Sequence, residues 1–199
     1  PTRRSSDLSL YRLGAYDRAV SLFDALANLA PGEYGGCHYL AGEIRHLQGR
    51  PEDAIESYRR SPDEPSVHYN LGLAYYQVGR REEAARTLIR GFSANPHIAV
   101  RLLDDETTSV AGPGGYLGSA TYAEEFLEAC TPLWTGCGEA LEFVHQCFEH
   151  PLVQEYLDAA GPPDSEGEPG GVAGRGRSES SCGRPDVDGI ARQVIEPME

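Results

Sequence analysis

Small and apolar residues recur along this chain in a pattern that is stated twice, thirty residues apart. The pattern comprises Gly42, Gly49, Ala54 and Tyr58 in the first copy and Gly72, Gly79, Ala84 and Leu88 in the second. The second glycine of each copy fits the left-handed turn that ends a helix, because glycine has no Cβ to clash there. Each copy therefore predicts a helical hairpin, and their succession predicts a solenoid in which each hairpin packs on its neighbours.

Residue size within the second copy indicates how its hairpin packs. We expect Gly72 and Gly91 where the two antiparallel helices approach closely, with Leu88 filling the space between them. Pro96 ends the second helix, because proline lacks the backbone N–H that continues the hydrogen-bond pattern. In the first copy Pro62 interrupts the second helix about one turn earlier.

A third, partial copy lies upstream of these two. Its residues Gly14, Ala19, Phe23, Leu26 and Pro31 have the same spacing as Gly79, Ala84, Leu88, Gly91 and Pro96. The match predicts a complete helix over residues 17–29, with only residues 8–13 left for the helix before it. Residues 1–8 match one reading frame of a common sequencing adapter, so we expect an artefact there and native sequence extending further upstream. The alternative for this segment is a flexible basic leader.

The second copy, which covers residues 69–88 and closes on Asn95-Pro96, strongly resembles the tetratricopeptide repeat. That family has a usual period of about thirty-four residues, and the shortened helix of the first copy accounts for the smaller spacing here. The resemblance implies an all-α, right-handed α-solenoid over residues 9–96, with one partial and two full hairpins. In this family the first helices of successive hairpins line a concave groove that binds a peptide or a partner helix. The groove positions in this chain would be Tyr39, Glu43, His46, Tyr69, Asn70, Leu73, Tyr76 and Gln77.

The repeat pattern is lost after Pro96, and the sequence of residues 97–160 predicts a divergent helical extension. It begins with a short helix or extended leg and continues into a polar loop over residues 104–118, which is long for a loop inside a domain. We expect this loop to be a loose insertion, with a binding loop as the alternative. The order of segments in this region is also similar to the part that follows the repeats in suppressor-of-tumorigenicity-seven-like proteins. That resemblance rests on short motifs and implies no residue role.

A pair of helices follows the loop. The first has a capping box formed by Thr121 and Glu124 and ends at Pro132. The second spans about residues 139–149, and we interpret the two as a degenerate repeat. A last helix, over residues 152–160, would then cap the end of the solenoid.

The end of the chain, residues 161–199, contains mostly glycine, proline, serine and acidic residues. Too few apolar side chains are present to offset the entropy of ordering the segment, so we predict a disordered tail. Residues 190–195 have the composition of a transient helix or a short docking motif, but disorder is the expectation here as well.

Composition narrows the classes of partner. The net charge is −14 and all 17 basic residues are arginine, whereas a nucleic-acid surface requires clustered Lys and Arg, so we expect no nucleic-acid partner. No apolar run approaches the roughly 18 residues of a membrane span. The five cysteines have irregular spacing, which predicts reduced thiols and a cytoplasmic location. A signal peptide upstream of residue 9 is the open alternative.

No group of residues indicates catalysis or a cofactor. Cys37 and His38 are neighbours in sequence without an orienting third group, and the glycines of residues 112–115 lack the Lys-Ser/Thr of a phosphate loop. The candidate zinc ligands lack the close Cys-x-x-Cys pair of structural sites; they are Cys130, Cys137, His145, Cys147 and His150. We therefore predict a protein that is not an enzyme, with no cofactor and no metal site.

These observations favour a scaffold or adaptor that binds a peptide or a partner helix in the concave groove. Acidic chaperone tails are not the expected partner, because the groove offers no basic clamp for a carboxylate. The alternative is the recognition module of a larger enzyme or regulator whose active domain lay upstream. A third alternative is self-association through the ends of the solenoid, since an uncovered apolar end favours pairing.

Overall fold

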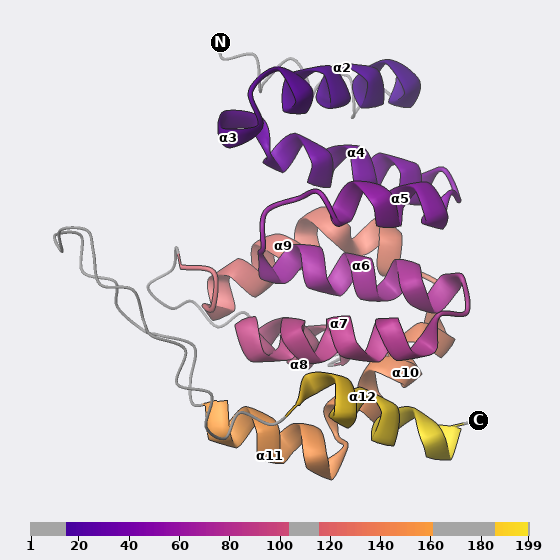
Figure 1. Ribbon diagram of the computed structural model, residues 1–199, viewed down its shortest axis with the longest axis vertical. Helices are drawn as coiled ribbons and strands as arrows, with labels where there is room; N and C mark the ends of the chain where they lie inside the picture. The colour runs from indigo at the N-terminus through magenta and orange to yellow at the C-terminus, as the bar shows by residue number, and fades with distance from the viewer. Residues whose placement is uncertain (1–14, 104–115, 161–185, 199) are drawn as a thin grey trace, which may run out of the picture.

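The computed structural model describes residues 15–103, 116–160 and 186–198, and within these ranges the chain forms helices and no strands. The elements, in chain order, are α2 Tyr16–Leu29, α3 Pro31–Tyr34, α4 Gly36–Leu47, α5 Pro51–Tyr58, α6 Pro65–Gln77, α7 Arg81–Ala94, α8 Pro96–Leu103, α9 Ala120–Trp134, α10 Gly138–Phe148, α11 Pro151–Ala160, α12 Val187–Ile195 and a 3-10 turn at Glu196–Met198. Figure 1 shows α2, α4, α5, α6 and α7 stacked in that order. The described part of the chain is thus an all-α solenoid.

The two full hairpins predicted from the glycine pattern are α4–α5 and α6–α7, whose helices pack against each other. Gly49 and Gly79 follow the first helix of each hairpin with φ angles of 72° and 78°, in the left-handed region that glycine adopts without strain. Helix α5 has 8 residues and α7 has 14. This difference confirms that a shortened helix reduces the spacing of the repeat.

Close approach of the paired helices depends on glycine. A Cβ added to Gly42 would lie 2.6 Å from Cε1 of Tyr58, and one added to Gly72 would lie 2.7 Å from Cγ of Leu88. Both larger side chains are almost completely buried, so neither has free space into which it can move. The contact role predicted for Gly72 is confirmed, and Gly42 has the same role in the first hairpin.

Helix α2 precedes the hairpins and packs on α4. Its apolar face places Ala19 and Phe23 against Ala41 and Ile44 in a small core separate from the main one. An ion pair between Arg45 of α4 and Asp24 of α2, 2.6 Å apart, strengthens the contact. The helix predicted over residues 17–29 is confirmed, whereas residues 1–14 lie outside the described residues.

Helix α9 differs from its prediction at both ends. Its N-cap is Ser119, whose hydroxyl accepts a hydrogen bond from the N–H of Tyr122, and not Thr121. Its C-terminal end is Trp134, so Pro132 lies inside the helix. Proline removes only the bond that its own N–H would donate, and the helix keeps the bond from the N–H of Thr135 to the carbonyl of Thr131 beyond it.

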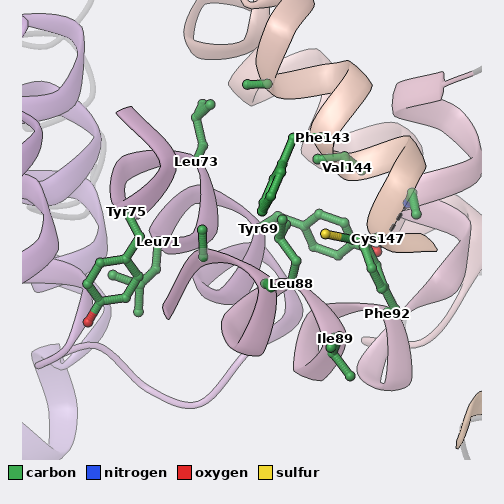
Figure 2. Packing of buried hydrophobic residues seen from close by; sticks show 14 of the residues in the cluster. Tyr69, Leu71, Leu73, Tyr75, Leu88, Ile89, Phe92, Phe143, Val144 and Cys147 are labelled. Atoms are coloured by element: carbon green, nitrogen blue, oxygen red, sulfur yellow. Dashed lines mark hydrogen bonds between the residues drawn. The ribbon is translucent and has the colours of Figure 1, made fainter. Parts of the chain in front are cut away.

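The interpretation of α9 and α10 as one degenerate hairpin is wrong. Helix α9 packs mainly on α8 and α4, whereas α10 packs on α7, α8 and α6. Figure 2 shows Phe143, Val144 and Cys147 of α10 pointing toward the α6–α7 hairpin. The pattern of small and apolar residues identified two helices correctly, but it carried no information about which neighbours they contact.

The prediction of disorder is wrong for the last helix, α12. Ile190 and Val194 are one turn apart and buried against α7, and Asp186 caps the helix by accepting from the N–H of Asp188. Asp188 also forms an ion pair of 2.7 Å with Arg86 of α7. A few apolar residues suffice here because an existing helix supplies the other half of the interface. Residues 161–185 and the loop residues 104–115 lie outside the described residues.

Replacement of Gly42 by Ala tests the close approach of α4 and α5. Alanine gains intrinsic helix stability, but its Cβ would overlap the ring of Tyr58, so we expect the free energy of unfolding to fall by about 1–3 kcal/mol. Chemical denaturation measures this change. Gly36→Ala is the matched control, because a Cβ there meets no atom within 4 Å; an equal loss in both variants would contradict the packing argument.

The docking of α12 is tested by placing the same charge at two adjacent positions. Val194 is fully buried and Gln193 is exposed. Because an unpaired buried carboxylate is costly, Val194→Asp should detach α12, with amide hydrogen exchange over residues 187–195 at least about tenfold faster. Gln193→Asp should leave exchange near that of the parent chain. Equal exchange in the two variants would show that α12 is not held through this face.

Candidate functional site

The eight residues predicted to line the concave groove lie on α4 and α6, and helices α9 and α10 cover most of them. Tyr69 and Asn70 are fully buried, Leu73 is 1% exposed, and Glu43 and His46 are also buried. Tyr39 and Tyr76 are partly buried, and of the eight only Gln77 is exposed. The expectation of an open groove along these residues is therefore wrong. Their use by a partner stays a prediction.

A buried polar cluster holds α9 on this face. The thiol of Cys130 donates to Oε1 of Glu43 at 3.2 Å and lies 3.3 Å from the hydroxyl of Tyr39. The Asn70 amide donates to the Tyr39 hydroxyl at 2.9 Å and accepts from the indole N–H of Trp134 at 3.1 Å. The hydrogen-bonding groups that suggested a partner-binding groove thus bind a helix of the same chain.

The N-terminal end of α9 is positioned by Asn95, which follows α7. Its side-chain amide donates to the carbonyl of Leu117 at 2.7 Å and to that of Ser119 at 3.0 Å. Farther along α9, the hydroxyl of Tyr122 donates to Oγ of Ser66 at 3.0 Å. Figure 1 shows the resulting path of α9 behind α6.

Other predicted groove residues join one layer of the solenoid to the next. A ring nitrogen of His46 lies 2.9 Å from the side-chain oxygen of Gln77, a contact between α4 and α6. Tyr69 donates to the carbonyl of Asn95 at 2.8 Å, and the ring of Tyr76 packs on Phe143 with centroids 4.9 Å apart. These contacts are the structural roles of the four residues.

Burial changes the protonation of the cluster beneath α9. It raises the pKa of Glu43 to about 7, although hydrogen bonds from Cys130 and Tyr39 partly counteract the shift. Burial, followed by the charge of Glu43, also raises the pKa of the Cys130 thiol. Cys130 is consequently a protonated donor in this site rather than a nucleophilic thiolate.

Beyond α9 the concave face continues into an open pocket of about 510 Å³. We call it the α9-side pocket; its lining residues are Phe23, Leu26, Glu33, Tyr34, Gly36, Cys37, Tyr39, Leu40, Pro62, Glu64, Ser66, Val67, Tyr122, Glu125, Phe126, Ala129 and Cys130. The lining is apolar and aromatic, with three carboxylates at Glu33, Glu64 and Glu125. A surface of this kind suits the side chains of a peptide segment.

Sequence reasoning found one residue of this pocket, Tyr39, among the eight. The remaining lining comes from α2, α3, α4, the segment entering α6, the start of α6, and α9, and α9 is far from the others in the chain. The sequence contained one signal for the α9 part of this lining, the spacing of Tyr122, Phe126 and Ala129. Residues three and four apart share a helix face. That spacing did not reveal that α9 faces α4.

Metal and membrane chemistry receive no support from the described residues. Within residues 15–103, 116–160 and 186–198, no three His, Cys, Asp or Glu side chains gather as metal ligands do. None of the helices described here combines the length and the apolar character that a bilayer crossing requires.

Glu43→Gln tests the buried cluster through its pH dependence. Because the folded-state pKa is raised from 4.5 to about 7, Glu43 contributes stability that is present below pH 4.5 and lost as the pH rises to 7. We expect the free energy of unfolding of the parent, relative to that of the variant, to fall by roughly 3 kcal/mol over this window. Denaturation at a series of pH values measures it.

The comparison with the variant is necessary because His46 acts in the opposite direction. Burial lowers its pKa, so its contribution to stability increases with pH, and it is the same in both proteins. The exposed Glu56→Gln controls for net charge. A parent-minus-variant difference that is independent of pH would show that Glu43 is not buried under α9.

Comparison with known families identifies repeats in two overlapping segments. A family described as TPR repeat matches residues 42–79, and one described as tetratricopeptide repeat matches residues 65–98. Neither a curated protein nor a solved structure matches the chain, so the similarity to suppressor-of-tumorigenicity-seven-like proteins stays a prediction. Repeats of this type are in general non-catalytic protein-interaction modules. Residues 42–98, which cover most of the α4–α5 hairpin and all of the α6–α7 hairpin, thus match the tetratricopeptide repeat.

Proposed function

We propose that this protein is a non-catalytic scaffold or adaptor that holds a peptide or a partner helix in the α9-side pocket. The observation that carries the proposal is the pocket itself, which α2, α3, α4, the start of α6 and α9 line together. Its volume of about 510 Å³ lies within the usual range for sites that bind small ligands or anchoring side chains.

The position of α9 supports this mode of binding. Phe126, Cys130 and Trp134 of α9 are almost completely buried, and the latter two hydrogen-bond to side chains of α4 and α6. The concave face therefore has the shape and the hydrogen-bonding groups to hold a helix. A partner segment in the pocket would lie next to α9 and contact it directly.

The binding residues in this proposal differ from those expected from the repeats alone. Tyr39 is common to both sets, whereas Tyr34, Leu40 and Tyr122, which are only partly buried, replace the residues that α9 and α10 cover. Helix α9 has two roles in this arrangement. It fills the middle of the concave face, and it forms one wall of the site.

The buried thiols and the net charge restrict the cellular compartment and the class of partner of the proposed scaffold. The buried thiols of Cys130 and Cys147 suit a reducing compartment such as the cytoplasm. With a net charge of −14, the protein repels nucleic acid, so the partner of this proposal is a protein or a peptide.

A displayed library of random peptides, about a dozen residues long, tests the proposal on the full chain. Selected peptides should slow amide hydrogen exchange in residues 34–40 and 122–130 and leave α7 and α12 unchanged. Ala129→Trp should abolish binding because it fills the pocket. Glu128→Trp is the matched control, since Glu128 is exposed and outside the pocket lining. Absence of any selected peptide, or protection confined to α7 and α12, would contradict the proposal.

A further inference from the structure

We infer that the segment held in the α9-side pocket is basic, with Arg or Lys side chains beside one or more large apolar residues. This inference rests on the proposed function and specifies its partner. It follows from the charges around the pocket, which all have the same sign, and from the apolar surface between them.

Three carboxylates line the pocket, each from a different segment of the chain. Glu33 belongs to α3, Glu64 precedes α6, and Glu125 lies on α9. The described lining contains no arginine and no histidine. A cation that enters the pocket therefore meets carboxylates and no basic side chain of the lining.

Two carboxylates on other positions of the helices that line the pocket are neutralised within the chain. Glu124, the neighbour of Glu125 on α9, forms an ion pair of 2.9 Å with Arg101, and Asp24 forms one with Arg45. Within the described residues no ion pair involves Glu33, Glu64 or Glu125, so their charges face the pocket without a basic partner there.

The apolar part of the pocket is the reason for the large apolar residues in the inferred segment. Leu40, Val67 and Phe126 contribute apolar surface beside the carboxylates, and burial of an apolar side chain there supplies affinity without charge. Aromatic rings at Tyr34 and Tyr122 add a surface on which a guanidinium group stacks favourably. Arginine next to Leu, Phe or Tyr fits both parts of the pocket.

Concavity strengthens the preference for a cation. A cleft with walls of low dielectric constant and charges of one sign focuses the electrostatic potential, and the net charge of −14 adds to it at longer range. An acidic segment is repelled by the same field. The site therefore discriminates by charge before any side chain enters it.

Three displayed peptide libraries test the inference on the full chain. They share random apolar positions and differ only at fixed positions, which are Arg, Gln or Glu. We expect enrichment of the Arg library about tenfold above the Gln library, with no enrichment of the Glu library. Replacing Glu33, Glu64 and Glu125 together by Gln should abolish the advantage of the Arg library.

A control variant with Glu56, Glu128 and Glu155 replaced by Gln has the same net charge as the test variant. These three residues are exposed and outside the pocket lining, so the Arg library should keep its advantage. An equal loss in both variants, or equal enrichment of the Arg and Gln libraries, would overturn the inference while leaving the proposed function intact. Failure of all three libraries to bind would overturn both.

Discussion

Helix α9 is attached to the first helices of the repeats, and this attachment determines which residues of those helices are buried and which can meet a partner. Trp134 and Cys130 insert among Asn70, Tyr39 and Glu43, and each polar group of this cluster has a hydrogen-bond partner. A buried polar cluster of this kind is stable only when its members are satisfied together. The position of α9 is therefore specified by directional bonds as well as by apolar contact, and the same helix forms one wall of the pocket.

This attachment changes the usual relation between a helical repeat and its partner. The middle of the concave face is part of the core, since Asn70 and Tyr69 are fully buried. In the proposed function, binding takes place instead at a site built jointly by α2, α3, α4, the start of α6 and α9. The proposed partner contacts both the repeats and the helical extension, and the carboxylates that select it come from both.

Sequence periodicity predicted the repeats well because their packing is local. Gly42 contacts Tyr58 and Gly72 contacts Leu88 within one hairpin, so the spacing of small residues carries the whole signal. The path of α9 depends instead on contacts such as Cys130 with Glu43, which are 87 residues apart, and no periodicity encodes such pairs. For the same reason α12 was missed. Its few apolar residues are meaningful only beside α7, which provides the surface they bury.

Trp134 is the only tryptophan of the chain. The solvent exchange of its indole N–H proton is the most direct test of where α9 lies. In a nuclear magnetic resonance spectrum of the full chain, this proton should exchange slowly with solvent and show nuclear Overhauser contacts to the side chain of Asn70. That result would establish that α9 occupies the concave face. Rapid exchange of the indole proton without a contact to Asn70 would mean that the face is open, and would contradict the account.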